Sequence, residues 1–323
     1  MIKAFVVEND RLRRVDQLAD NKDNIVWIDL LSPTKEEETE IEALIGVAVP
    51  TREEMEEIEI SSRLYVEDGA YFMTANLPSQ TDDDPVMSPV TFVLAGKRLV
   101  TVRYHEPRAF MTFPMRAEKA STGCAAGDTI LVGLLEAIVD RLADVLERAG
   151  RDIETISRDI FQAPQGKASK RNRDFQALLK AVGRKEDIAS SVRESLTTLQ
   201  RVSGFLNHAA TQTRMGKDTK ARIKTLSRDV LSLADHAAFM SQKINFLLDA
   251  TLGMISIEQN AIIKIFSVAA VVFLPPTLVA SIYGMNFDFM PELKWAFGYP
   301  LALGLMILSA ILPFWYFRQR GWL

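Results

Sequence analysis

Neutral oxygen ligands gather near the end of the chain, directly after a segment without charge. Ile265 to Tyr283 contains no Asp, Glu, Lys or Arg, and the amide of Asn286 follows it. Magnesium prefers six oxygen ligands and gives up water reluctantly, so this amide and backbone carbonyls near Gly284 can hold the hydrated ion through its waters. Gly284 is expected to let the backbone turn here. The alternative is that Asn286 only caps a helix.

Residues in and before this segment recur every three to four positions, which places them on one face of a helix. They are Asn260, Phe266 or Ser267, Ala270, Leu274, Thr277, Ser281 and Gly284. Polar groups inside a bilayer are costly unless they face protein or water. The face is therefore expected to line a watery path, or alternatively to pack against another helix.

Two charge-free runs, Ile265–Tyr283 and Tyr299–Phe317, are each close to the roughly twenty residues that cross a bilayer. Their short spacing predicts a transmembrane hairpin. The first run has more polar residues, so it is expected to line the path while the second faces lipid. One hairpin per chain cannot enclose a pore, so several subunits are required.

The basic residues that flank the hairpin predict its orientation. They are Lys243 and Lys264 before the first run and Arg318 and Arg320 after the second. By the positive-inside rule both termini are cytoplasmic. Glu292 in the connecting loop is then external, where it can form an acidic ring that concentrates cations or remain an ordinary solvated charge.

The first part of the chain has the pattern of an α/β domain. Short β-type runs are predicted at Lys3–Val7, Ile25–Leu30, Tyr71–Leu77, Val90–Leu94 and Leu99–Tyr104. A helix start is expected at Ser32-Pro33-Thr34, with Pro33 near the first helical position, and a capping box at Thr51–Glu54.

Helical spacing replaces this pattern after Asp128. The predicted helices run from Asp128 to a break near Ala163–Gly166, from about Asn172 to Thr213, and from Lys217 without a breaker to Pro275. If the third continues through the membrane it is roughly 90–100 Å long. Such a helix requires a stalk that packs against its own copies or its two predecessors. A soluble three-helix bundle is the alternative.

Composition excludes several function classes. The net charge of −4 gives no overall basic signal for nucleic acid, and Cys124 is the only cysteine. The chain has no Gly-rich phosphate loop, dinucleotide fingerprint, H-E-x-x-H or paired C-x-x-C motif. We expect neither an enzyme nor an organic cofactor. The three histidines are expected to be ordinary packing or surface residues.

The run Tyr283-Gly284-Met285-Asn286-Phe287 resembles the signature of the CorA magnesium-channel family. The resemblance extends to Phe273–Ala280 before it, to Met290–Leu293 and Gly298–Pro300 after it, and to the final Trp322-Leu323. The basic tail is thinner here, with only Arg318-Gln319-Arg320 before Gly321. A strong basic ring at the inner membrane surface is therefore less expected.

The resemblance implies a funnel-like homopentameric channel in the inner membrane that admits magnesium passively, with cobalt and nickel as further candidate cargoes. Its parts are a cytoplasmic α/β domain (1–127), a stalk (128–260) and a hairpin with its tail (261–323). Gly284, Met285 and Asn286 would form the selectivity filter. The residues expected to line or gate the pore are Asn260, Phe266, Leu274, Thr277 and Ser281, with Phe266 and Leu274 as apolar constrictions.

The family also implies regulation by cytoplasmic magnesium, bound between the α/β domain of one subunit and the stalk of the next. By position, Glu56 or Glu57 would face Asp229 or Asp235 across that interface. A bound divalent ion would relieve repulsion between these carboxylates and favour the closed state. The alternative is an ordinary solvated acidic face.

Two other functions remain open. A zinc transporter of the ZntB branch would share this architecture, although that branch tends to vary the position of Met285. A membrane-tethered sensor or scaffold without conduction is the alternative from another class. Selective uptake of magnesium over zinc would distinguish a magnesium channel from the zinc transporter. Ion flux by the purified protein would distinguish a channel from the sensor or scaffold.

Overall fold

The structure, a computed structural model of the 323-residue chain, describes residues 1–15, 18, 22–79, 86–120, 123–161, 175–212, 215–286 and 290–321. It divides into two units, Met1–Leu248 and Asp249–Leu323. The predicted break at 163–166 lies outside the described residues.

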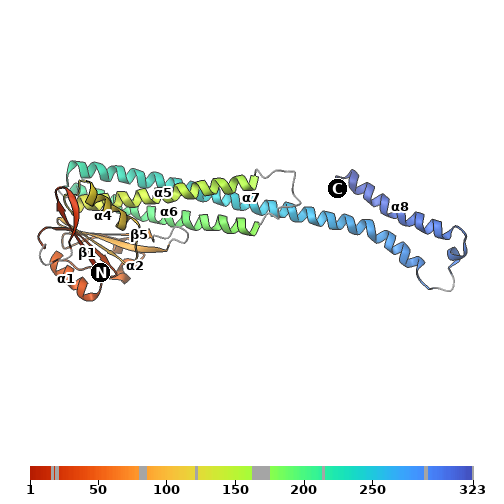
Figure 1. Ribbon diagram of the computed structural model, residues 1–323, viewed down its shortest axis with the longest axis horizontal. Helices are drawn as coiled ribbons and strands as arrows, with labels where there is room; N and C mark the ends of the chain where they lie inside the picture. Colours follow the sequence, from red (N-terminus) through yellow and green to blue (C-terminus); the bar gives the residue numbers. More distant parts are fainter. Residues whose placement is uncertain are drawn as a thin grey trace. The chain divides into compact units, whose positions relative to one another are not determined.

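Among the described residues, unit 1 contains a seven-stranded mixed sheet in the order β2-β1-β3-β7-β6-β5-β4 (Figure 1). Only β3 and β7 are parallel among the described neighbours. The strands are β1 (Ile2–Glu8), β2 (Arg11–Val15), β3 (Ile25–Leu31), β4 (Leu64–Glu67), β5 (Ala70–Pro78), β6 (Met87–Ala95) and β7 (Arg98–Arg103). Five of them match the predicted runs; β2 and β4 were not predicted.

Both missed strands belong to tight hairpins. Asn9 and Asp10 have φ of 53° and 62° between β1 and β2, and Asp68 and Gly69 have φ of 48° and 77° between β4 and β5. Left-handed conformations at both central residues suit the twist of a two-residue hairpin turn, for which Asp-Gly is a strong signal. The Asp68-Gly69 pair therefore gave a usable signal for β4, whereas β2 had no comparable one.

Capping side chains begin the first two helices, α1 (Lys35–Ile45) and α2 (Arg52–Glu56). Thr51 and Glu54 form the predicted capping box of α2. The predicted start of α1 was wrong in one detail, because Thr34 is the N-cap and Pro33 precedes it. Thr34 and Glu37 form a capping box at the start of α1, in which the Thr34 N–H donates to the Glu37 carboxylate at 3.0 Å.

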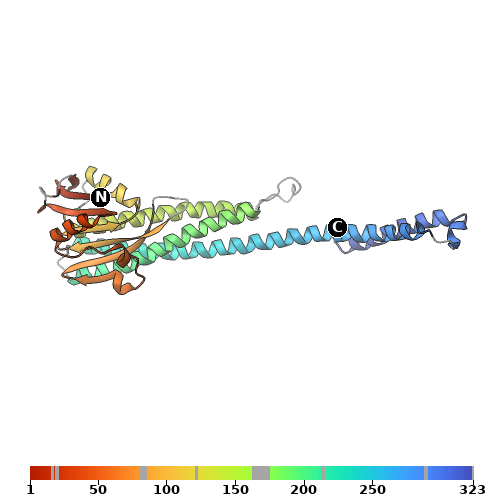
Figure 2. The ribbon, with the colours of Figure 1, turned by 90° about the horizontal axis from the view of Figure 1, so that it is seen from below.

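Helices α5 (Gly127–Phe161) and α6 (Phe175–Gln212) lie beside the first part of α7 (Lys217–Tyr283) in two perpendicular views (Figures 1 and 2). The bounds of α5 and α6 agree with the predicted helices within a few residues, whereas α7 continues past Pro275 to Tyr283. Three ion pairs join the helices within unit 1: Asp152–Lys185 at 2.6 Å, Glu154–Lys243 at 2.7 Å and Glu136–Arg222 at 2.7 Å.

Two short helices complete unit 1: α3 (Ile60–Arg63) and α4 (Ala109–Lys119). Helix α4 was not predicted. It packs on α5 and contains Pro114. Phe110, Phe113 and Ala117 of this helix are buried, and both rings lie near Trp27 of the sheet. A proline inside so short a segment weakens the sequence signal for a helix.

A buried ion pair joins the parallel strands β3 and β7. Arg103 donates from Nε to Asp29 Oδ1 at 2.9 Å and from Nη2 to Asp29 Oδ2 at 2.8 Å. Thr101 donates to the same carboxylate at 2.9 Å and accepts from Trp27 Nε1 at 3.1 Å. The guanidinium also lies over the Phe110 ring, 4.8 Å from its centroid. This network fixes the centre of the sheet and its contact with α4.

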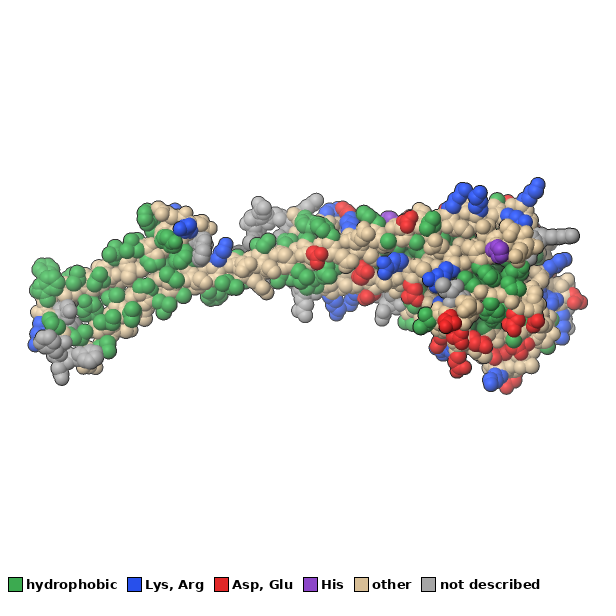
Figure 3. Space-filling view, turned by 180° about the vertical axis from the view of Figure 1, so that it is seen from behind, with side chains coloured by type: hydrophobic (Ala, Val, Ile, Leu, Met, Phe, Trp, Pro, Cys, Tyr) green, Lys and Arg blue, Asp and Glu red, His purple; other side chains and the backbone are tan. Residues whose placement is uncertain are grey.

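Unit 2 contains the rest of α7, the 3-10 helix η2 (Pro291–Lys294) and α8 (Gly298–Gln319). Two helices, α7 and α8, are long and apolar enough to cross a membrane, and only 6% of the most apolar stretch of each is buried. Figure 3 shows mostly apolar side chains on this unit, whereas most acidic and basic side chains lie on unit 1. The exposed apolar surface requires a lipid or protein environment.

Candidate ion pathway

Helix α7 carries the predicted pore residues on one face. With roughly 100° per residue, Asn260, Phe266, Leu274, Thr277 and Ser281 fall within an arc of about 120°. All five are exposed in the single chain. From the first to the last, the rise is roughly 30 Å, comparable with a hydrocarbon core.

Phe266 and Leu274 present large apolar side chains on this face. Phe266 is 71% exposed and Leu274 is 64% exposed. Both side chains are therefore available for contact with lipid or with another chain. Copies of the chain arranged around an axis would bring these side chains together.

Prolines change the backbone chemistry beside Leu274. Pro275 and Pro276 lie inside α7 and have no N–H. They therefore cannot donate the helical bonds that Val271 and Val272 carbonyls would otherwise accept. One turn on, the Thr277 hydroxyl donates to the Phe273 carbonyl at 2.7 Å. Its oxygen keeps lone pairs, and the hydrogen is already used within the helix.

The Gly284-Met285-Asn286 segment follows the last turn of α7. Gly284 N–H donates to the Ala280 carbonyl at 2.9 Å, and Met285 N–H donates to the Ile282 carbonyl at 3.3 Å. These bonds end the helix directly before Asn286. All three residues are exposed, so the amide and nearby carbonyl groups are accessible to a ligand.

Gly284 lies in a turn, as expected. Its backbone is not left-handed, so the turn itself does not demand glycine. A Cβ at Gly284 would lie 3.1 Å from the Ala280 carbonyl oxygen, so a larger residue would require the last helical turn to shift by a few tenths of an ångström.

Short contacts order the connection to α8. Gly298 N–H donates to the Trp295 carbonyl at 3.0 Å, and the Trp295 and Phe297 rings lie edge to face at 6.1 Å. Glu292 belongs to η2, but its side chain lies outside the described part of the structure. The acidic ring stays a prediction.

The predicted regulatory carboxylates lie on α2, at its C-cap and on α7. Glu56 pairs with Arg52 at 2.9 Å, and the Glu57 carbonyl accepts a bond from Arg63 Nε. Asp229 and Asp235 are exposed on α7. In the described residues, no group of three or more His, Cys, Asp or Glu side chains is arranged to hold a metal ion. A site made by these carboxylates would need a second copy.

The charge of Asp229 affects one carboxylate on α5, Asp140. Burial raises the pKa of Asp140 on α5, and the carboxylates of Glu136, Asp144 and Asp229 add to this effect, while Arg116 opposes it. Asp229 is thus close enough to Asp140 to repel its charge. Sequence reasoning missed Asp140, because the pairing of α5 with α7 joins residues far apart in the chain.

Comparisons with known proteins agree with one another. A family model described as CorA-like Mg2+ transporter protein matches residues 22–319. The chain is 40% identical over 325 aligned positions to the magnesium transport proteins CorA of Pasteurella multocida (strain Pm70) and of Escherichia coli (strain K12), with all of each chain covered.

Solved structures share the fold. The complete structure of the CorA magnesium transporter from Methanocaldococcus jannaschii matches with a TM-score of 0.76 at 18% identity, covering 100% of this chain and 99% of the other. The ZntB cytoplasmic domain from Vibrio parahaemolyticus matches with 0.54 at 9% identity, covering 79% and 97%. At these identities the likeness concerns architecture alone.

Proposed function

The chain belongs to the CorA-like Mg2+ transporter family, and on that premise we propose that it conducts magnesium passively through a pore made by several copies, five by family resemblance. The observation that carries the proposal is one exposed face of α7. It combines neutral oxygen atoms with apolar side chains and ends directly before Gly284-Met285-Asn286. Neither a sensor nor a scaffold needs such a face.

Selection would occur where Asn286 follows α7. A ring of neutral amide oxygens contacts the waters of a hydrated ion, so magnesium need not lose its shell. Gly284 keeps the last turn close to the ring, and Met285 supplies an apolar neighbour. Farther along the same face, Thr277, Ser281 and Asn260 offer further oxygen atoms. Neutral ligands bind weakly enough for the ion to move on.

Leu274 and Phe266 would close the path when copies meet around an axis. Apolar constrictions exclude water, and a hydrated divalent ion cannot follow. Opening would require these side chains to move apart. Pro275 and Pro276 lie next to Leu274, where two helical hydrogen bonds are missing, so the helix can bend there at low cost.

The membrane potential is a sufficient driving force. With both termini in the cytoplasm, influx of a divalent ion gains roughly 4.6 kcal/mol at 100 mV. This corresponds to accumulation of roughly 2,000-fold at equilibrium. The oxygen ligands proposed for the pore suit magnesium rather than zinc or copper, which favour nitrogen and sulfur. Cobalt and nickel are further proposed cargoes by family resemblance alone.

The direct test is magnesium flux into vesicles that contain only the purified protein. An imposed inside-negative potential should drive uptake without ATP or a proton gradient. Asn286→Ala should abolish uptake and leave assembly intact, with Ser309→Ala on α8 as a matched control that keeps it. Uptake without a potential dependence would contradict the passive mechanism.

The same vesicles separate the alternatives. Zinc uptake in preference to magnesium would favour a ZntB-like transporter, and no flux of any divalent ion would favour a sensor or scaffold. Near-normal transport by correctly assembled Asn286→Ala would remove that residue from the mechanism.

We further propose that cytoplasmic magnesium closes the pore by binding between copies, with Glu56 or Glu57 opposite Asp229 or Asp235. Repulsion between carboxylates supports this, since a divalent ion would offset it. Magnesium at millimolar concentrations should protect the long helices from protease, and variants of the true ligands should lose this dependence. Identical digestion with and without magnesium in the wild type rules out the feedback.

A further inference from the structure

A series of hydrogen bonds connects the acidic loop between α2 and α3 (residues 57–59) to helix α6 through the side chain of Arg63. Arg63 is the last residue of α3, and its Nε donates to the carbonyl of Glu57, the C-cap of α2. Its Nη1 donates to Asn76 Oδ1 on β5 at 3.2 Å. One guanidinium group therefore holds the main chain of the acidic loop and the end of a central strand at the same time.

Asn76 extends this connection from β5 to α6 through two further bonds. Its side-chain Nδ2 donates to Glu194 Oε1 at 2.7 Å, and its backbone N–H donates to Thr198 Oγ1 at 3.1 Å. Glu194 and Thr198 are four residues apart, so they lie on one face of the helix. The Thr198 hydroxyl donates in turn to the Ser195 carbonyl at 2.9 Å. The strand is thus attached to one defined face of α6.

The charge of Arg63 is sensitive to its surroundings. Burial lowers the pKa of Arg63, the carboxylate of Glu194 raises it, and the charge of Arg201 lowers it again. A cation that is partly removed from water responds to any further charge placed beside it. A divalent ion bound by the acidic loop would be such a charge, so its binding would reach Arg63 electrostatically as well as through the bonded main chain.

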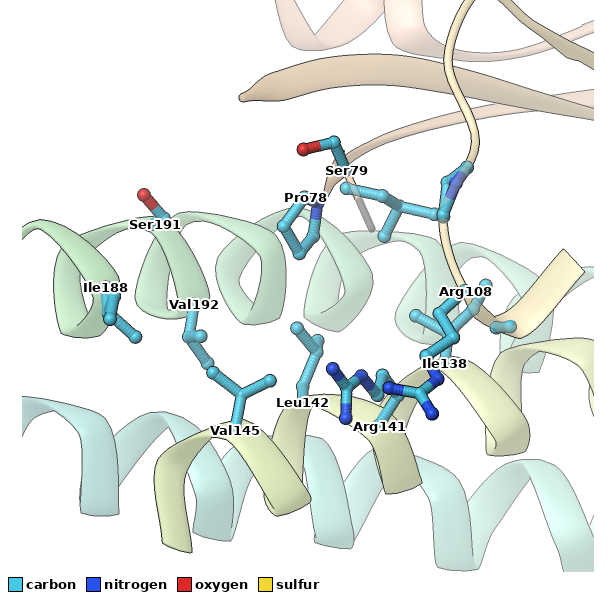
Figure 4. A pocket seen from close by; sticks show the side chains of 13 residues that line it. Pro78, Ser79, Arg108, Ile138, Arg141, Leu142, Val145, Ile188, Ser191 and Val192 are labelled. Atoms are coloured by element: carbon cyan, nitrogen blue, oxygen red, sulfur yellow. The ribbon is translucent and has the colours of Figure 1, made fainter. Parts of the chain in front are cut away.

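Helix α6 also packs against α5 close to these bonds. Val192 on α6 and Val145 on α5 point toward each other, and both line a hollow with Pro78, which follows Asn76 by two residues on β5 (Figure 4). Packed side chains transmit small displacements, because they leave little free space. A restraint that reaches α6 from β5 would therefore also act on the contact between α6 and α5.

We propose that Arg63 is a positioning residue for the regulatory magnesium ion and couples its site to helix α6. The inference rests on the proposed role of Glu56 or Glu57 as a ligand of that ion. Arg63 holds the main chain at Glu57, and Asn76 extends this hold to α6. Magnesium at the acidic loop should therefore restrain α6. Because coupling between two sites is reciprocal, breaking the link should also weaken magnesium binding.

Hydrogen exchange of the full chain in lipid nanodiscs, followed by mass spectrometry during a magnesium titration, measures both ends of the network. In the wild type, magnesium should slow exchange in residues 52–63 and in residues 188–200 with one shared midpoint. Arg63→Lys keeps the positive charge, but an ammonium group does not reproduce the two bonds of the guanidinium fork. It should raise the midpoint at the loop by about fivefold or more and remove most of the α6 response.

Two further variants separate positioning from a purely structural role. Asn76→Ala keeps the bond between Arg63 and Glu57 but loses the side chain that reaches α6. Its loop midpoint should change by less than about twofold, while the α6 response becomes clearly smaller. Arg193→Lys is the matched control, because Arg193 is exposed on α6 beside Glu194 and takes no part in the bonds described above. It should behave like the wild type at both ends.

Contrary results distinguish a failure of the coupling from a failure of the magnesium site. If magnesium does not slow exchange at the acidic loop of the wild type, the feedback site and the coupling both fail. If the loop responds and α6 does not, or if α6 responds equally in Arg63→Lys and Asn76→Ala, only the coupling fails. An unchanged loop midpoint in Arg63→Lys excludes the positioning role. The wild-type comparison needs no variant, so poor folding of one variant does not prevent the test.

Discussion

Replacing Asp29 by alanine tests how strongly unit 1 depends on its buried ion pair. The carboxylate accepts bonds from Arg103 Nε at 2.9 Å, Arg103 Nη2 at 2.8 Å and Thr101 Oγ1 at 2.9 Å. Alanine removes these acceptors and leaves the Arg103 guanidinium in a site where its side chain is 2% exposed. The guanidinium of Arg103 keeps its contacts with the His105 carbonyl and the face of the Phe110 ring, but neither group carries a negative charge that would compensate for the loss.

The expected loss is large compared with the stability of a domain. Removing one partner of a buried pair typically costs about 3–5 kcal/mol, while a domain is stable by only about 5–15 kcal/mol. Replacing both partners, as Asp29→Leu with Arg103→Met, removes the isolated charge as well. Such double replacements are often neutral or stabilising, so the double variant should be more stable than Asp29→Ala.

Hydrogen exchange of the β3 and β7 amides measures this loss in the full chain. Where exchange follows unfolding of the sheet, rates should rise by about one hundredfold to a few thousandfold in Asp29→Ala. Glu8→Ala is the matched control on the same sheet, since its pair with Arg13 has side chains 52% and 66% exposed. A rise below about tenfold in Asp29→Ala, or a double variant no better than the single one, would refute the reasoning.

Four further perturbations address the ion path and the pH dependence. Leu274→Gly should leak magnesium at high cytoplasmic magnesium in flux assays, because it removes an apolar constriction. Thr277→Val should reduce flux tenfold or more without changing the melting temperature, and Thr277→Ser should not, since only Ser keeps the hydroxyl oxygen. Gly284→Ala should lower flux, because its Cβ would crowd the Ala280 carbonyl at 3.1 Å. Burial lowers the pKa of His105 from 6.5 to about 4; its contribution to stability is therefore present above pH 6.5 and lost as the pH falls toward 4, and His105→Asn should flatten the melting-temperature profile there.

Each of these has a contrary result. An unchanged current in Leu274→Gly counts against a gate at that position. Equal flux in both Thr277 variants assigns the hydroxyl to helix packing, and normal flux in Gly284→Ala means that the last turn adapts. A His105→Asn profile that parallels the wild type between pH 6.5 and 4 shows that carboxylates alone determine the acid loss.

The sequence predicted the helices better than the sheet. The three long helices have sustained periodicity, and their bounds follow from it within a few residues. Strand β2, by contrast, reads Arg-Leu-Arg-Arg-Val and buries only Leu12 fully, so its composition does not indicate a strand. It exists because Asn9 and Asp10 turn the chain back onto β1. Tertiary pairing decides short strands of this kind.

Local spacing also explains which parts of the site were predictable. Asn286 and the α7 face lie within one continuous segment, so periodicity and the family resemblance were sufficient to propose them. The bond between Asp29 and Arg103 joins residues 74 apart, and the bond between Glu136 on α5 and Arg222 on α7 joins residues 86 apart. Such pairs depend on strand order and helix packing, which no single window of sequence contains.

In the proposed pore, the hydroxyl group of Thr277 would suit a cation better than an anion. Ser309 on α8 donates to the Met306 carbonyl at 2.9 Å, and Thr277 on α7 donates to the Phe273 carbonyl at 2.7 Å. Each hydrogen is used within its own helix, so a hydroxyl in lipid leaves no donor unsatisfied. What Thr277 then presents outward is an oxygen acceptor, one per copy. A ring of acceptors attracts the positive end of a charge distribution, which suits a hydrated cation and disfavours an anion. The hydrogen bond from the Thr277 hydroxyl to the Phe273 carbonyl thus leaves an oxygen acceptor, which would interact favourably with a hydrated cation.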